Sequence, residues 1–263
     1  MPNVKVLFMG RKPVASMCLE YLLTVTNLEV VAVLTDSHLE VSHTSETARN
    51  AGIPIYDFDI ALEKIRNGAL NFDIGFSMLY WRKLRGDFLT KPSLGVINFH
   101  PAPLPEYKGT AGYNMAILDG REDWAVTAHY VDASIDTGQI IETEKFPINK
   151  DYETAKSLEG QCQTELFEQF KRVAHTAINS SELLPARENT GGRYISRTEM
   201  ESMKEVKPGD DISRKIRAFW FPPYDGAFMM VNGVKCTLID RSILESLSDN
   251  SSKPGAVHTT RHP

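Results

Sequence analysis

The segment VKVLFMGRKPVASMCLEYLL, residues 4–23, decides the fold. A largely apolar run of strand length ends at Gly10, and Pro13 then opens a stretch whose apolar residues recur at helical spacing. By the same patterns, further strands are expected at 29–34, 73–77 and 94–99, and further helices at 44–51 and 81–89. Strands that alternate with helices predict an α/β fold with a parallel sheet and helices on both faces. Any chemistry is then expected beyond the carboxyl ends of the strands.

The second half of the chain predicts a long helix and a separate C-terminal region. Two more strands are expected at 124–131 and 139–146, and residues 152–179 keep the single apolar stripe of a helix packed on the sheet. The residues that follow position 184 are mostly polar, which suggests a main domain at 1–184 and a linker with a small appendage at 185–263. The appendage is expected to hold a helix at 212–219, a β-hairpin at 227–239 and a loose segment at 246–263.

Composition narrows the class of protein. The 263 residues carry 29 basic and 34 acidic side chains, and this balance disfavours nucleic acid as the main partner. The three cysteines are far apart and match neither a disulfide framework nor a zinc site, which predicts a reducing compartment. No apolar run reaches the ~20 residues that span a bilayer, and the start lacks a signal-peptide layout. We therefore expect a cytoplasmic protein without membrane or metal partners.

Polar residues follow one apolar strand in the segment VINFHPAPLPEYKG, residues 96–109. Asn98 and His100 are two residues apart, so both side chains can point into the same crevice. Prolines at 101, 103 and 105 then stiffen the path of the backbone, which suits positioned catalytic groups. A second piece is the turn around Asp136, between the strands at 124–131 and 139–146.

A histidine, an asparagine and an aspartate can together run acyl transfer to an amine. Attack on a formyl carbon makes a tetrahedral oxyanion, and donors from Asn98 and His100 would stabilise it; losing one such donor typically costs about 3–4 kcal/mol. Asp136 would raise the proton affinity of His100 or accept the amine proton itself. Since no serine or cysteine nucleophile is placed beside the histidine, direct transfer fits better than a covalent intermediate.

These motifs, Asn98-Phe-His100 with its prolines, Lys108-Gly109, Asp132 and Ile135-Asp136-Thr-Gly138, resemble the signature of the folate-dependent formyltransferases. That family includes glycinamide ribonucleotide transformylase, methionyl-tRNA formyltransferase and nucleotide-sugar N-formyltransferases. The resemblance spans about residues 4–180. It implies a Rossmann-like catalytic domain over 1–184, the catalytic set Asn98, His100 and Asp136, and 10-formyltetrahydrofolate as formyl donor.

The resemblance also implies two binding walls for the reduced folate. Residues 76–81 match the loop that receives the pterin, so Met78, Leu79 and Tyr80 are candidate folate-binding residues. The turn that forms the other wall adds Asp132 and Ile135 as candidates. The alternative for the first three is ordinary core after a strand.

Residues outside these motifs are candidates for the acceptor site. Arg11 and Lys108 could meet a pyrophosphate, and Trp220, Phe221 and Tyr224 could stack on a nucleobase or a sugar. The alternatives are solvated surface charge for the cations and hydrophobic packing or a dimer interface for the aromatic cluster.

The acceptor is expected to be a nucleotide-linked 4-amino-4,6-dideoxyhexose, as in O-antigen biosynthesis, handled by a homodimer. Methionyl-tRNA formyltransferases carry a further β-barrel domain, whereas the residues after Val206 suggest the shorter tail of sugar N-formyltransferases. Rival hypotheses are a methionyl-tRNA formyltransferase-like enzyme, a non-catalytic folate-binding relative, and a metallohydrolase that uses His100, His129 and Asp136. His129 itself is expected to be a buried structural histidine.

Overall fold

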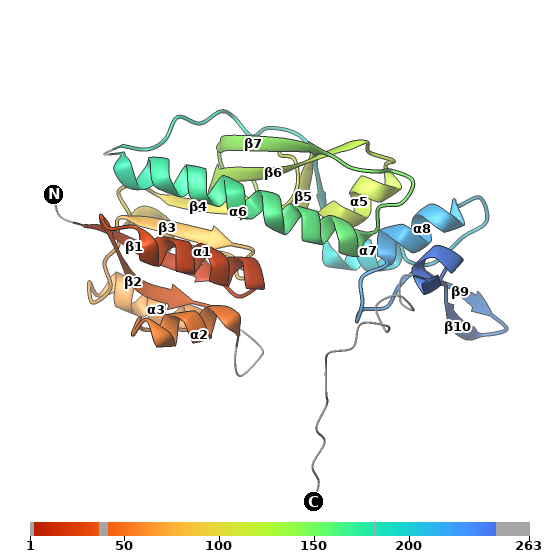
Figure 1. The fold of residues 1–263 in the computed structure, drawn as a ribbon, viewed down its shortest axis with the longest axis horizontal. Helices are drawn as coiled ribbons and strands as arrows, with labels where there is room; N and C mark the ends of the chain where they lie inside the picture. Colours follow the sequence, from red (N-terminus) through yellow and green to blue (C-terminus); the bar gives the residue numbers. More distant parts are fainter. Residues whose placement is uncertain (1–2, 37–41, 181, 246–263) are drawn as a thin grey trace, which may run out of the picture.

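The computed structural model describes residues 3–36, 42–180 and 182–245 (Figure 1). Its centre is one six-stranded sheet in the order β2-β1-β3-β4-β6-β7. The first four strands in that order are parallel, and β6 and β7 continue the sheet in antiparallel pairs. The strands are β1 Val4–Gly10, β2 Leu28–Leu34, β3 Ile74–Met78, β4 Val96–His100, β6 Asp123–Tyr130 and β7 Ile140–Pro147. The predicted α/β class with a mainly parallel sheet is confirmed.

Helices cover both faces of this sheet. The helices of this part of the chain are α1 Pro13–Thr24, α2 His43–Asn50, α3 Phe58–Arg66, α4 Asp87–Thr90, α5 Gly112–Leu118 and α6 Ala155–Asn179. Alternate residues of β1 point to opposite faces, so Phe8 packs with α1 and α6 while Leu7 packs with α3 and α4. The helix predicted over 81–89 is wrong except for α4, because residues 79–86 form a loop.

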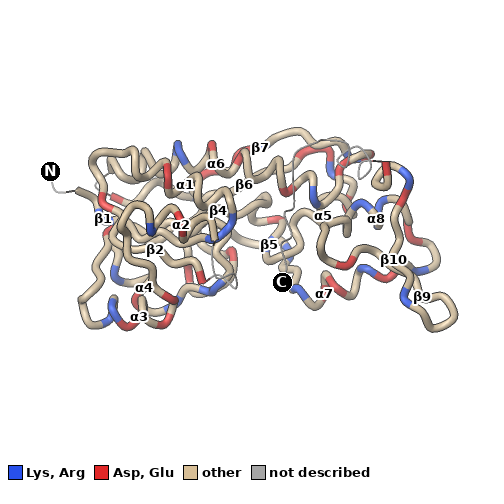
Figure 2. Tube along the Cα trace, turned by 60° about the horizontal axis from the view of Figure 1, so that its bottom comes forward, with Lys and Arg blue, Asp and Glu red and all other residues tan. Residues whose placement is uncertain are grey.

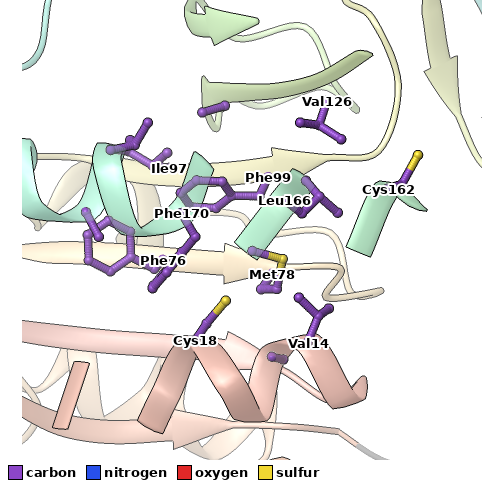
Figure 3. Packing of buried hydrophobic residues seen from close by; sticks show 14 of the residues in the cluster. Val14, Cys18, Phe76, Met78, Ile97, Phe99, Val126, Cys162, Leu166 and Phe170 are labelled. Carbon is purple, nitrogen blue, oxygen red and sulfur yellow. The ribbon is translucent and has the colours of Figure 1, made fainter. Parts of the chain in front are cut away.

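Helix α6 supplies the centre of the larger core. Thr154 caps its N-terminus by accepting a hydrogen bond from the backbone N–H of Ser157. Figure 3 shows Phe170 of α6 among Phe76 and Phe99, with ring centroids 5.4 and 5.0 Å away. Such close aromatic packing fixes the height of α6 over the strands that carry the polar residues.

The C-terminal elements are α7 Arg197–Ser202, α8 Ile212–Phe219, β9 Phe228–Val231 and β10 Val234–Thr237. They lie at one end of the molecule (Figure 1), where α8 packs with α5 and α6 in a smaller hydrophobic cluster. The predicted hairpin is confirmed: Asn232 and Gly233 both have positive φ, as a type I′ turn requires. The prediction for 246–263 lies outside the described residues. Two short strands, β5 Tyr107–Gly109 and β8 Arg193–Ile195, pair with each other across the proposed domain boundary, which stays a prediction.

Among the residues described, no helix combines the length and the apolar character needed to cross a membrane.

Replacing Phe170 with Ala is expected to lower the free energy of unfolding by about 3–5 kcal/mol, because the cavity left among the aromatic rings cannot close. Urea denaturation measures this loss. The matched control is Tyr152→Ala, since the Tyr152 side chain is exposed and its removal should cost less than about 0.5 kcal/mol. Equal losses for the two variants would contradict this account of the core.

Candidate active site

Strand register lines up three polar side chains in one row. Ser77 of β3 is the partner of Asn98 of β4, which is in turn the partner of His129 of β6. Ser77 Oγ donates to Asn98 Oδ1 at 2.7 Å, and Asn98 Nδ2 lies 3.0 Å from His129 Nε2. His129 Nδ1 lies 2.7 Å from the carbonyl of Tyr130, which can only accept, so Nδ1 carries the proton and Nε2 accepts from Asn98. This row orients the amide and leaves it one further N–H to donate.

His100 ends β4, two residues beyond Asn98 on the same face. Its Nε2 lies 2.9 Å from the carbonyl oxygen of Tyr107 and therefore donates to it. Its Nδ1 faces the Asp136 carboxylate, 3.5 Å from Oδ2. Burial lowers the pKa of His100, although Asp136 pulls that pKa upward. The neutral imidazole thus presents a lone pair on Nδ1 beside a carboxylate.

Asp136 lies in the turn between β6 and β7 with φ of 54°, a conformation that is strained for a residue other than glycine. Its Oδ2 accepts the backbone N–H of Gly109 at 2.9 Å, and its Oδ1 lies 3.6 Å from His129 Nε2. Burial opposes ionisation, but His100 and His129, which attract the carboxylate when they are protonated, and the Gly109 N–H outweigh it and hold the pKa of Asp136 well below its usual range. Asp136 is a carboxylate at neutral pH.

These side chains share one cavity of about 480 Å³. The sequence-predicted residues that line it are Asn98, His100, Asp136, Leu79, Tyr80, Asp132, Ile135, Arg11, Phe221 and Tyr224. Three other candidates lie outside the lining. Met78 is fully buried in the core, Lys108 Nζ donates to the carbonyl of Gly191 at 2.8 Å, and Trp220 packs on the cluster around α8.

The loop after β3 is held in place by Asp36, at the end of β2. Its carboxylate accepts hydrogen bonds from the Tyr80 hydroxyl and the Arg82 guanidinium, and its carbonyl accepts the Trp81 indole N–H at 2.9 Å. Burial and the Asp36 carboxylate together raise the pKa of Tyr80, so its hydroxyl stays protonated and donating. The adjacent Leu79 has φ of 50°, a further strained residue at the cavity wall.

Sequence reasoning missed both Asp36 and Ser77 as parts of this site. Each lies at or just after the carboxyl end of a buried strand, β2 and β3 respectively. A systematic search of those ends, where open α/β sheets bind their ligands, would have found both.

No group of three or more His, Cys, Asp or Glu side chains within 3–36, 42–180 and 182–245 is arranged to hold a metal ion. His100, His129 and Asp136 instead contact one another and backbone groups.

Solved structures with this fold include sugar-modifying enzymes. The N-formyltransferase from Helicobacter canadensis, in complex with folinic acid and dTDP-3-aminofucose, has a TM-score of 0.72 and 26% identity, covering 88% of this chain and 86% of that one. A 4-N formyltransferase from Francisella tularensis has a TM-score of 0.76 over 90% of this chain and 97% of its own, and at 19% identity it speaks for the fold alone.

Sequence relatives include methionyl-tRNA formyltransferases. The protein of Listeria innocua is 28% identical over 98% of this chain and 84% of its own length. The protein of Treponema denticola is 31% identical over 61% of this chain and 49% of its own length. Residues 26–173, more than half of the chain, match the family described as formyl transferase. The chain, with its Asn98, His100 and Asp136 gathered at one cavity, therefore belongs to the formyl transferase family.

Proposed function

We propose that this formyltransferase moves a formyl group from 10-formyltetrahydrofolate to the amino group of a nucleotide-linked amino sugar of the 4-amino-4,6-dideoxyhexose type. The observation that carries the proposal is the set of Asn98, His100 and Asp136 at one cavity, with His100 Nδ1 3.5 Å from the Asp136 carboxylate. An amide donor, a basic nitrogen and a carboxylate are the groups that direct amine attack on a formyl group requires.

In this proposal the donor supplies an activated formyl group and the protein stabilises charge and moves a proton. The free N–H of Asn98 donates to the developing oxyanion. His100 acts as base through Nδ1, because its Nε2 proton is held by the Tyr107 carbonyl and a neutral ring has no second N–H to offer. Asp136 stabilises the imidazolium that forms when His100 takes the amine proton. The bond between the formyl carbon and the folate nitrogen then breaks, and the imidazolium returns the proton to that leaving nitrogen. This differs from the expected oxyanion role of His100 and leaves that role to Asn98.

The residues of the cavity fit a reduced folate. Leu79 and Ile135 lie on the two predicted walls, and Ile135 is exposed although it is a large apolar side chain. A flat ring inserted between them would cover this apolar surface. The Asp36 hydrogen bonds hold the first wall in its strained conformation before any ligand arrives, which reduces the ordering cost of binding.

The acceptor proposal rests on the aromatic side chains and cations in the cavity lining and on the relative from Helicobacter canadensis. Aromatic side chains of Tyr194, Phe221 and Tyr224 line the cavity together with the cations of Arg11 and Arg197. Arg197 lies over the Tyr224 ring, 5.8 Å from its centroid. Aromatic faces beside cations suit a sugar or base joined to a diphosphate. Work on such an acceptor fits a cytoplasmic enzyme, and a homodimer remains part of the proposal.

A methionyl-tRNA acceptor is the second candidate, because methionyl-tRNA formyltransferases match almost the whole chain. Binding of tRNA is driven largely by phosphate contacts from a basic surface. Figure 2 shows Lys and Arg residues interspersed with Asp and Glu along the described chain rather than gathered in one block. This distribution favours the sugar acceptor.

A panel of acceptors incubated with 10-formyltetrahydrofolate tests the function. We expect a mass gain of one formyl group on a nucleotide-linked 4-amino-4,6-dideoxyhexose, with dTDP, GDP and UDP forms compared, and no gain on methionyl-tRNA. A 3-amino isomer in the same panel tests the position of the amine. Formylation of the 3-amino sugar alone would overturn the proposed sugar, and formylation of methionyl-tRNA alone would overturn the acceptor class.

Replacing Asp136 with Asn is expected to lower kcat by about 10²–10⁴-fold, because a neutral amide cannot stabilise the imidazolium on His100. Steady-state kinetics and a thermal melt measure activity and folding together. The matched control, Asp123→Asn, loses only surface ion pairs with Arg121 and Lys145 and should keep its kcat. Near-normal turnover in Asp136→Asn would contradict the proposed role.

The ring of His100 is expected to titrate with a midpoint below the ordinary imidazole value of about 6.5, because burial lowers its pKa. NMR of labelled histidine measures the midpoint, and His100→Asn assigns the signal. In Asp136→Asn the midpoint should fall further, since the carboxylate that raises the pKa is gone. A midpoint above 6.5 would contradict the lowering of the pKa by burial.

A further inference from the structure

Residues 187–195, here called the strap, cross both loops that carry the reacting groups. The backbone of Arg187 exchanges two hydrogen bonds with Ile140, at 2.8 and 2.9 Å, just after the Asp136 turn. Further along, β8 pairs with β5 in the loop that follows His100. Gly192 approaches this loop so closely that a Cβ would lie 1.6 Å from the Pro105 carbonyl oxygen. The strap therefore contacts both the segment that follows His100 and the segment that follows Asp136.

Asn189 is the strap residue that reaches the Asp136 turn. Its side-chain Nδ2 donates to the carbonyl of Asp136 at 3.0 Å and to the carbonyl of Gly138 at 2.8 Å. Asn189 is buried, 8% exposed, and is not part of the cavity lining. One amide group thus uses both of its N–H bonds on two carbonyls of a single turn.

That turn needs external support. Asp136 has a left-handed backbone, with φ of 54°, which costs of order 1–3 kcal/mol in a residue with a side chain. Gly138 packs so tightly that a Cβ there would lie 1.8 Å from the Tyr130 carbonyl oxygen, so the turn has little room to relax. The two bonds from Asn189 hold the backbone on either side of Thr137 in this conformation.

The strap also positions the backbone N–H of Gly109, from which the Asp136 carboxylate accepts a hydrogen bond. Gly109 donates its N–H to Asp136 Oδ2 at 2.9 Å, and the next N–H, of Thr110, goes to the carbonyl of Ile195 in the strap at 3.3 Å. Both ends of the Gly109–Asp136 hydrogen bond are therefore anchored on the strap. A shift of either end would move the carboxylate relative to His100 Nδ1.

We infer that Asn189 is a positioning residue for formyl transfer, which holds the turn at 136–138 so that the Asp136 carboxylate stays against His100 and Gly109. Its effect on the rate rests on the proposed function. The strap lies outside residues 26–173, which match the family. It belongs to the segment that the sequence predicted to be a linker.

The test compares Asn189→Ala with Arg187→Ala. The control removes a strap side chain whose hydrogen bond goes to Thr143 Oγ1 on β7, away from the turn. In Asn189→Ala we expect kcat to fall about 10- to 100-fold with the KM of donor and acceptor within about twofold, as for a misplaced reacting group. Arg187→Ala should keep its kcat. Equal kcat in Asn189→Ala and the wild type would overturn the inference.

A readout that does not depend on activity separates this inference from the proposed function. Hydrogen exchange of the Gly109 amide, followed by NMR, should be about tenfold faster or more in Asn189→Ala and unchanged in Arg187→Ala. Unchanged exchange at Gly109 in both variants overturns the positioning role even if the wild type transfers formyl groups. Faster exchange in a protein that formylates no acceptor keeps the positional claim and refutes only the proposed function.

Two further variants address the cases in which Asn189→Ala does not fold or in which Asn189 has only a structural role. Asn189→Ser keeps one donor, so it should recover part of the lost kcat and provides a folded alternative if Asn189→Ala does not fold. In the background of Asp136→Asn, the change Asn189→Ala should add less than about twofold to the loss of kcat, because both act through one carboxylate. Fully multiplicative losses would show that Asn189 acts elsewhere.

Discussion

The site depends on keeping one carboxylate charged inside the protein. A buried charge is costly unless partners compensate it, and Asp136 accepts the Gly109 N–H and faces two imidazoles that attract it when they take up a proton. Those partners come from β4, β6 and the loop after His100, so the charge ties together segments that are distant in the chain. As a result, the lone pair on His100 Nδ1 lies beside the Asp136 carboxylate, which favours protonation of the imidazole.

Sheet register supplies the second half of the site. Ser77, Asn98 and His129 occupy one row because three neighbouring strands pair in register, and each residue uses the hydrogen-bonding capacity of the next. The core fixes that register from below, through the rings of Phe76, Phe99 and Phe170. Packing on one side of the strands therefore sets the direction of an amide N–H on the other.

Strained backbone marks both walls of the cavity, and in each case a side chain from elsewhere holds it. Asp36 holds the loop that contains Leu79, and Asn189 holds the turn that contains Asp136. Strain of this kind persists only where the surroundings over-determine the conformation. A preformed cavity needs less ordering when a ligand binds, which suits a reaction that must align two substrates.

The sequence alone determined the α/β class, the hairpin and the resemblance of the motif residues to formyltransferases, because these features depend on local periodicity, turn chemistry and short spacings. It also pointed to Asn98, His100 and Asp136 as a group, since strand ends and turns are local features. It could not show that the segment read as a linker turns back over the site, or that Lys108 bonds to Gly191. Only the tertiary structure decided those contacts, together with the parts played by Asp36, Ser77 and Asn189. Their hydrogen bonds join residues 21 to 53 positions apart, and no local pattern encodes a partner at that distance.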